Sequence, residues 1–227
     1  MIIRLGLNDL GHQVGHFARR VELAARLARF GSKIADYVHD VEQIAKTLPT
    51  PPALIGHSMG GFLTQKYLER NTAPAAVLLA SNPYFGLWPT FLRMSAQRPL
   101  TLLKVLSQLR LYPVVENSEA ARWTLFSKDM PEEQVLKYHK KMNDESFRMF
   151  LDLLGLNLAH PQKIKTPLLI LGAEFDNAIT AGQVHATARG YGLQAEIFPN
   201  MAHDMMVEAG WRSVAERILN WLNEKGI

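Results

Sequence analysis

The amino-acid sequence predicts an α/β protein with a mostly parallel sheet flanked by helices. Short apolar runs without polar alternation recur along the chain, and such runs are typical of parallel strands that are covered on both faces. Helical patterns, with apolar residues at three- and four-residue steps, separate the runs. We expect strands at residues 53–56, 75–80, 167–171 and 194–198, with residues 2–7 as a candidate fifth strand.

Residues 84–162 differ from the rest of the chain. They contain several helical stretches punctuated by prolines, and no segment in them has a strand pattern. A helical block between two strands of an α/β sheet indicates a cap over the carboxyl edge of the sheet, where open α/β folds bind ligands. We therefore expect a core made of residues 1–83 and 163–227 and a helical cap, or lid, made of residues 84–162.

Composition excludes several classes of protein. Of the 227 residues, 48% are hydrophobic and 20% are charged, which is ordinary for a folded domain. Cysteine is absent, so disulfides, thiol catalysis and thiolate metal sites are excluded. No apolar run reaches the ~18 residues of a membrane span, and the first residues lack a signal-peptide pattern. We expect a cytoplasmic protein with no integral membrane association.

The net charge of +4 does not indicate a nucleic-acid partner. Part of the excess comes from Arg19, Arg20, Arg26 and Arg29, within a helical pattern over residues 17–30. A charge run of this kind is usually the solvated face of a helix. We therefore predict no binding to nucleic acid.

The motif GHSMG occupies positions 56–60, directly after the first of the four clear apolar runs and at the start of a helical stretch. In this setting G-x-S-x-G is typical of a nucleophile elbow, a sharp turn that exposes the serine at the top of the sheet. The turn strains the backbone of Ser58 and crowds the positions two before and two after it, which explains Gly56 and Gly60. The alternative is a plain strand-to-helix turn with a capping serine.

A serine nucleophile needs a base, and the base needs an orienting carboxylate. After such an elbow the expected chain order is Ser, then Asp or Glu, then His. Asp176 and His203 fit this order, because each lies in a loop just after a predicted strand, at the same sheet edge as Ser58. Glu174 is a rival for the acid, but Asp176 lies further into the loop. The alternative for Asp176 is a turn or capping residue before the next helix.

The remaining histidines do not indicate a metal centre. None of them has a ligand spacing such as H-E-x-x-H. His57 is adjacent to the nucleophile and should point away from it at the turn, so we expect a supporting role. We predict neither a metal site nor a cofactor.

Three segments of the chain resemble the α/β-hydrolase superfamily, especially its small bacterial esterase- and lysophospholipase-like members. They are LIGHSMGG at residues 54–61, LLILGAEFD at 168–176 and MAHDMM at 201–206. The resemblance extends from residue 34 to the C-terminus and includes the helical cap. It implies Ser58 as nucleophile with Asp176 as acid and His203 as base. It also implies the Met59 N–H as one oxyanion donor.

The N-terminal part does not resemble the family. Family members have several strands before the elbow, one of which ends in a His-Gly loop that supplies the second oxyanion N–H. The nearest candidates, Gly11-His12 and Gly15-His16, lack a glycine after the histidine. We therefore expect a truncated N-terminal part and a reduced activity. The sheet edge beside Leu54 then lacks its usual neighbour. We therefore expect either a homo-oligomer in which a second copy pairs with this edge, or an edge that is covered by the N-terminal helix.

These observations favour a serine hydrolase that cleaves a carboxylic ester or a related acyl substrate. An apolar acyl or alcohol group is suggested by the apolar cap residues Phe85, Leu87, Trp88, Phe91, Leu92 and Met94, unless they are only the cap's own packing. Among them we take Phe85, Trp88 and Phe91 as the candidate pocket residues. The alternative function is a catalytically impaired remnant that acts as a binding or interaction protein. The same triad also serves lyases and perhydrolases. Ser58 disfavours haloalkane dehalogenation, because that chemistry places Asp at this position.

Overall fold

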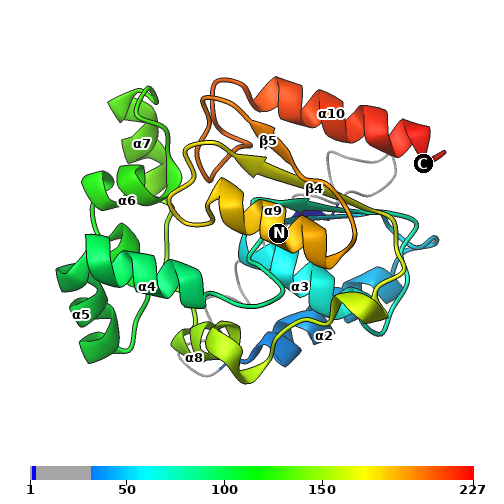
Figure 1. The fold of residues 1–227 in the computed structure, drawn as a ribbon, viewed down its shortest axis with the longest axis horizontal. Coiled ribbons are helices and arrows are strands. Elements are labelled where there is room, and N and C mark those ends of the chain that lie inside the picture. Colours follow the sequence, from blue (N-terminus) through cyan, green and yellow to red (C-terminus); the bar gives the residue numbers. More distant parts are fainter. Residues whose placement is uncertain (1, 4–31) are drawn as a thin grey trace.

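A five-stranded sheet forms the centre of the molecule (Figure 1). The computed structural model describes residues 2–3 and 32–227. The strands lie side by side in their chain order, with β2 to β5 parallel and β1 antiparallel to β2. This arrangement confirms the predicted α/β fold. The strands are β1 (Ile2–Ile3), β2 (Leu54–His57), β3 (Ala76–Leu79), β4 (Leu168–Ala173) and β5 (Glu196–Phe198).

Helices cover both faces of the parallel strands. Val77 of β3 packs in the cluster that includes α10 (Trp211–Glu224), whereas the adjacent Leu78 packs against α9 (Ala181–Gly190) on the opposite face. The helix α3 (Met59–Leu68) packs against β2 and β3, and α2 (Ile34–Lys46) packs against α3. Side chains on both faces of the strands are therefore buried, which is why the strand sequences are apolar runs without polar alternation.

The helix α10 shows how the sequence pattern fixes the packing. Its buried residues Val214, Ile218, Trp221 and Leu222 follow steps of four, three and one, so they form a single apolar stripe. This stripe packs on the sheet in one cluster with β3 and β4. No helix within residues 32–227 is both long and apolar enough to cross a membrane.

Between β3 and β4 the chain forms helices and no strand over residues 84–162, all of which the structure describes. Those of residues 88–139 lie at the end of the sheet toward which β4 points (Figure 1). They are therefore next to the carboxyl ends of the parallel strands. The helices of the whole block are α4 (Trp88–Gln97), α5 (Pro99–Gln108), η1 (Tyr112–Val115), α6 (Ser118–Leu125), α7 (Glu132–His139), α8 (Phe147–Leu151), η2 (Asp152–Leu156) and η3 (Pro161–Lys163).

The edge of β2 has a neighbour that the family resemblance did not lead us to expect. Ile2 pairs with Ile55 and Ile3 pairs with Leu54, so β1 covers part of this edge. This is the beginning of the candidate fifth strand. Residues 4–7 of that strand, the predicted helix at 17–30, and the Gly-His pairs at 11–12 and 15–16 lie outside the described residues. The homo-oligomer across this edge stays a prediction.

Phe62 of α3 joins the sheet layer to the helices between β3 and β4. It is fully buried in a cluster with Ile34, Met149 and Leu153. We expect Phe62→Ala to lower the free energy of unfolding by about 3–5 kcal/mol, because it removes apolar contacts and leaves a cavity. Urea denaturation measures this loss. Leu219→Ala, at a partly exposed position of α10, is the control, and an equal loss in both variants would contradict the assignment.

Candidate active site

Ser58 lies in a strained turn between β2 and α3. Its φ of 53° and ψ of −120° fall in a region that non-glycine residues rarely adopt. Backbone hydrogen bonds hold the turn, since the Ser58 N–H donates to the carbonyl of Leu79 at 3.0 Å and its own carbonyl accepts from Gly61 and Asn82 at 3.0 Å. This is the kind of turn that the GHSMG motif predicts, and it places Ser58 at the carboxyl end of β2.

Two glycines allow the turn to pack against its surroundings. A Cβ on Gly56 would lie 2.5 Å from the carbonyl oxygen of Gly60 and from Thr64 Oγ1. The second glycine, Gly61, was not singled out by the sequence argument. A Cβ there would overlap the side chain of Ser81 in the loop after β3. Gly61 therefore lets α3 approach this loop closely. The last glycine of GHSMGG is the sequence signal for that contact.

Asp176 and His203 meet at the carboxyl ends of β4 and β5. His203 Nδ1 lies 2.7 Å from Asp176 Oδ2, and both side chains are buried. The other carboxylate oxygen accepts hydrogen bonds of 2.7 Å from the N–H groups of Ala178 and Ile179. Asp176 is therefore both the turn residue and the partner of the histidine. These were alternatives at the sequence level.

The rival acid lies elsewhere. Glu174 is exposed, and its side chain accepts a hydrogen bond from the Asn200 N–H at 3.0 Å. Asp176 does not cap α9 either, because Thr180 does so through a hydrogen bond to the Gln183 N–H. The structure thus brings Asp176, and not Glu174, to the histidine.

The pKa of His203 reflects its pairing with Asp176. Burial by itself would lower its pKa, but the charge of Asp176, their hydrogen bond and the charge of Asp204 together raise the pKa above the ordinary value of 6.5. Because Nδ1 is engaged by Asp176, Nε2 is the nitrogen left for a second partner. His203 can therefore accept a proton at Nε2 while the carboxylate stabilises the imidazolium.

Ser58 and His203 line the same cavity, which has a volume of about 580 Å³. Met59 and Gly60 at the start of α3 also line it. Among the described residues, no hydrogen bond joins Ser58 Oγ to His203. Such bonds often tighten only when substrate is bound, so this arrangement is compatible with a nucleophile and its base.

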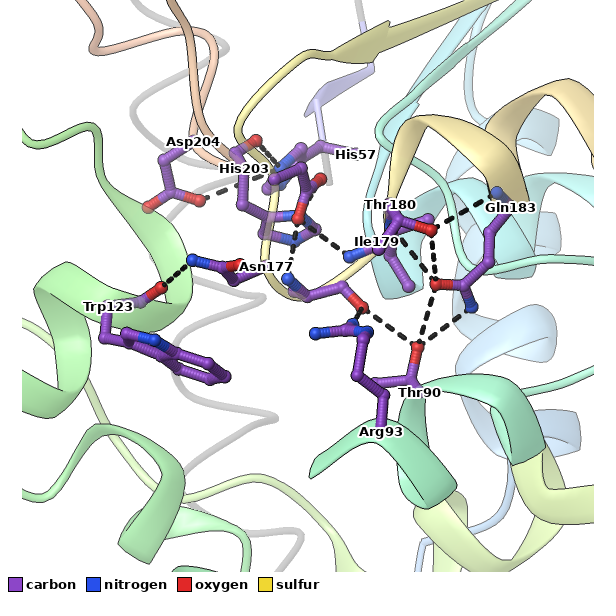
Figure 2. A network of polar contacts seen from close by, with 12 residues as sticks. His57, Thr90, Arg93, Trp123, Asn177, Ile179, Thr180, Gln183, His203 and Asp204 are labelled. Atoms are coloured by element: carbon purple, nitrogen blue, oxygen red, sulfur yellow. Dashed lines mark hydrogen bonds and ion pairs between the residues drawn. The ribbon is translucent and has the colours of Figure 1, made fainter. Parts of the chain in front are cut away.

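His57 also lines the cavity and supports the histidine loop. Its Nε2 lies 3.0 Å from the His203 carbonyl oxygen and 3.7 Å from Asp204 Oδ1, as Figure 2 shows. Burial, together with the nearby His203, lowers the pKa of His57 well below 6.5. His57 is therefore neutral, and its Nε2–H donates to the His203 carbonyl. This contact agrees with the supporting role that we expected for His57.

His57, His203 and Asp204 also bear on the question of a metal. Their ligand atoms lie within 4.8 Å of one another, which would suit a cation in the described part of the chain. However, His57 Nε2 already donates its proton to the His203 carbonyl, so this nitrogen has no lone pair for a cation. Burial, helped by the charges of Asp176 and Glu208, also raises the pKa of Asp204 to about 6. The lack of a metal stays a prediction.

Two helices of residues 84–162 hold the loop that carries Asp176 (Figure 2). On α4, Thr90 Oγ1 and Arg93 Nη2 donate to the carbonyl of Ala178 at 2.9 and 3.2 Å. On α6, the carbonyl of Trp123 accepts from Asn177 Nδ2 at 2.8 Å. The position of Asp176 therefore depends on contacts that reach across from α4 and α6.

The loop that carries His203 is held in the same way. The Asp204 N–H donates to the carbonyl of Leu125 at 3.0 Å. The buried Glu208 accepts from the N–H and the hydroxyl of Ser127, at 2.7 and 2.6 Å. The sequence argument missed these contacts, because nothing in the spacing of Thr90, Arg93 or Glu208 marks them as neighbours of the site.

Two of the three cap residues predicted to form the substrate pocket do not line the cavity. Phe91 lines it, but Trp88 is half exposed and packs edge-on against Phe91, and Phe85 packs edge-on against Tyr84. The structure does not bring these two residues to the cavity, because Phe85 precedes α4 and packs on Tyr84, and the phase of α4 turns Trp88 outward. Those that line the cavity from this region are Leu87, Thr90, Phe91 and Met94.

A parallel sheet, a strained serine turn between strand and helix, and a helical block at the carboxyl edge define the α/β-hydrolase class. Within it, the chain belongs to the serine aminopeptidase S33 family, whose sequence profile matches residues 15–210. No curated protein matches the chain.

Solved structures with 17–18% sequence identity share the fold. The putative non-heme bromoperoxidase BpoC from Mycobacterium tuberculosis H37Rv has a TM-score of 0.69 at 18% identity, covering 89% of this chain and 78% of that chain. The monoacylglycerol lipase of Paleococcus ferrophilus has a TM-score of 0.62 at 17% identity, covering 87% of this chain and 78% of that chain. A putative lipase from Acinetobacter baumannii AYE gives 0.62 at 17% identity, with 88% and 70% covered.

The pairing of His203 with Asp176 predicts the titration of the imidazole. NMR of the histidine ring should give a pKa above 6.5 for His203, and Asp176→Asn should lower it because the charge is removed. Glu174→Gln is the matched control, since Glu174 lies two positions away but contacts Asn200. An unchanged pKa in Asp176→Asn, or an equal fall in both variants, would rule out the pairing.

Proposed function

We propose that this hydrolase cleaves a carboxylic ester or a related acyl compound through a Ser58–His203–Asp176 triad. The observation that carries the proposal is the 2.7 Å contact between buried His203 and Asp176 beside a cavity that Ser58 also lines. The esterases and lipases among proteins of similar fold support the reaction class. They make this function preferable to a catalytically impaired remnant that only binds a partner.

The reaction proceeds through an acyl-enzyme. Ser58 Oγ attacks the acyl carbonyl carbon while His203 Nε2 takes the hydroxyl proton, and the oxyanion that forms collapses as His203 returns the proton to the leaving alcohol. Water then attacks the acyl-enzyme in the same way and releases the acid. Asp176 keeps the His203 proton at Nδ1 and stabilises the imidazolium that forms in each half-reaction.

The oxyanion requires N–H donors at the turn. We assign one of them to Met59, because its N–H lies at the N-terminus of α3, where helix N–H groups have no intrahelical partner and the helix dipole is positive. Losing one such donor typically costs about 3–4 kcal/mol of transition-state stabilisation. The second donor and the reduced activity expected from its absence stay predictions, because the candidate segments precede residue 32.

We assign the helices of residues 84–162 to a cap that binds an apolar part of the substrate. The cavity beside Ser58 is lined mainly by apolar side chains from these helices and the loops between them, including Phe91, Met94, Val105, Leu111, Met142 and Phe150. An alkyl or acyl chain in this cavity would leave water for an apolar surface. Phe91 is the one predicted pocket residue that keeps this assignment.

The cytoplasmic location stays a prediction that rests on the missing cysteines.

A fluorophosphonate probe tests the nucleophile. We expect it to label the chain at Ser58, because the reagent forms a bond with an activated serine hydroxyl, and Ser58→Ala should abolish both the labelling and the hydrolysis of p-nitrophenyl acetate. Ser213→Ala, at an exposed position of α10, should keep both. Labelling that persists in Ser58→Ala would refute the assignment, and a folded chain without turnover of any ester would favour the binding protein.

The cavity predicts a preference for longer acyl chains. Val105→Phe fills space in the cavity and should lower kcat/KM for p-nitrophenyl octanoate about tenfold, while the value for the acetate changes little. Leu106→Phe is the matched control, because the neighbouring Leu106 points outward from the same helix and is 45% exposed. Equal effects of the two variants on octanoate, or equal loss for both esters, would contradict an acyl site in this cavity.

A further inference from the structure

The helices α4 and α5 expose an unusual amount of apolar side chain. Leu100, Leu103 and Leu106 follow one another at three-residue steps on α5 and are 74%, 63% and 45% exposed. On α4, Trp88 and Leu92 lie one turn apart and are 50% and 63% exposed. Isolated exposed leucines are common, but such a concentration on one element marks an interaction site. These five residues are called the α4–α5 face.

The α4–α5 face lies at the outer edge of the molecule. The two helices pack side by side at the end farthest from the C-terminus of α10 (Figure 1). Their other sides are already used, since Phe91 and Met94 of α4 and Leu102 and Val105 of α5 line the cavity beside Ser58. The α4–α5 face is therefore the outer side of the same two helices that line the cavity, and only Trp88 of its five residues has a ring contact, with Phe91.

The charge of these helices limits the choice of partner. Residues 88–110 contain Arg93, Arg98, Lys104 and Arg110 and no aspartate or glutamate. Arg93 is turned toward the Ala178 carbonyl and Arg98 lies over the ring of Trp123. Lys104 and Arg110 pair with Glu116 and Asp144 from outside this stretch, but the two cations are 49% and 48% exposed and their acidic partners only 33% and 22%. The charge that these helices present to solvent is therefore mainly positive. Apolar side chains flanked by cations are typical of helices that lie in the interface of an anionic membrane.

We propose that the α4–α5 face binds the surface of an anionic lipid bilayer. The leucines and Trp88 enter the boundary between headgroups and acyl chains, and the half-exposed Lys104 and Arg110 lie next to anionic headgroups. A symmetric dimer through this face would bring the cations of two copies together, which disfavours a second copy as the occupant. Binding at the surface places the enclosed cavity next to a supply of apolar chains. The proposal concerns binding and does not rest on the proposed reaction.

Vesicle flotation tests this proposal. The full chain should float with vesicles of phosphatidylcholine containing about one-third phosphatidylglycerol, and the bound fraction should fall by about tenfold in Leu100→Gln/Leu103→Gln because two insertion side chains are lost. Leu193→Gln/Leu219→Gln is the matched control, since these leucines are 39% and 38% exposed but lie outside residues 84–162. It should bind as the unmodified chain does. Thermal unfolding should show that both variants are folded.

The same flotation assay tests whether positive charge on the protein contributes to lipid binding. Vesicles of phosphatidylcholine alone should bind the chain less, and added salt should weaken binding to the anionic vesicles. Absence of binding, equal binding by Leu100→Gln/Leu103→Gln, or equal binding to uncharged vesicles would overturn the proposal. So would a dimer on gel filtration that Leu100→Gln/Leu103→Gln converts to a monomer without any vesicle binding, because the α4–α5 face would then join two copies. None of these readouts uses ester turnover, so a failure of the proposed reaction would be seen separately.

Discussion

The buried carboxylate of Asp176 sets the requirements that the surrounding structure meets. A carboxylate without solvent is costly unless hydrogen bonds replace the lost water. The N–H groups of Ala178 and Ile179 satisfy one oxygen and His203 satisfies the other. The loop that supplies these N–H groups must keep its shape for the pair to form. Thr90 and Arg93 hold that loop from outside at the carbonyl of Ala178.

This dependence gives the helices of residues 84–162 a second role besides enclosing the cavity. Their contacts reach both loops at the carboxyl edge, through Trp123 to Asn177 and through Ser127 to Glu208. A cap that only opened and closed would not need buried, charged hydrogen bonds to the loops beneath it. The region around α6 therefore supports both loops, whereas the leucines on the outer side of α5 are exposed.

Strain at Ser58 is balanced by the sheet. The turn places Ser58 in an unfavourable backbone conformation, and hydrogen bonds to Leu79 on β3 and from Asn82 in the following loop hold it there. Gly61 allows the loop after β3 to lie directly against α3. The parallel register of β2 and β3 thus determines where the serine is presented, in addition to the local motif.

The sequence by itself determined the α/β fold, the chain order of Ser58, Asp176 and His203 with each just after a strand, and the sharp turn at Ser58. Periodicity, glycine spacing and chain order encode these features locally. Only the tertiary structure decided between Asp176 and Glu174, because both follow β4 and the difference lies in which carboxylate turns toward His203. It also excluded Phe85 and Trp88 from the cavity and brought in Thr90, Arg93 and Glu208 as supports. Contacts between segments about 80 residues apart depend on how helices pack, and no local pattern records that packing.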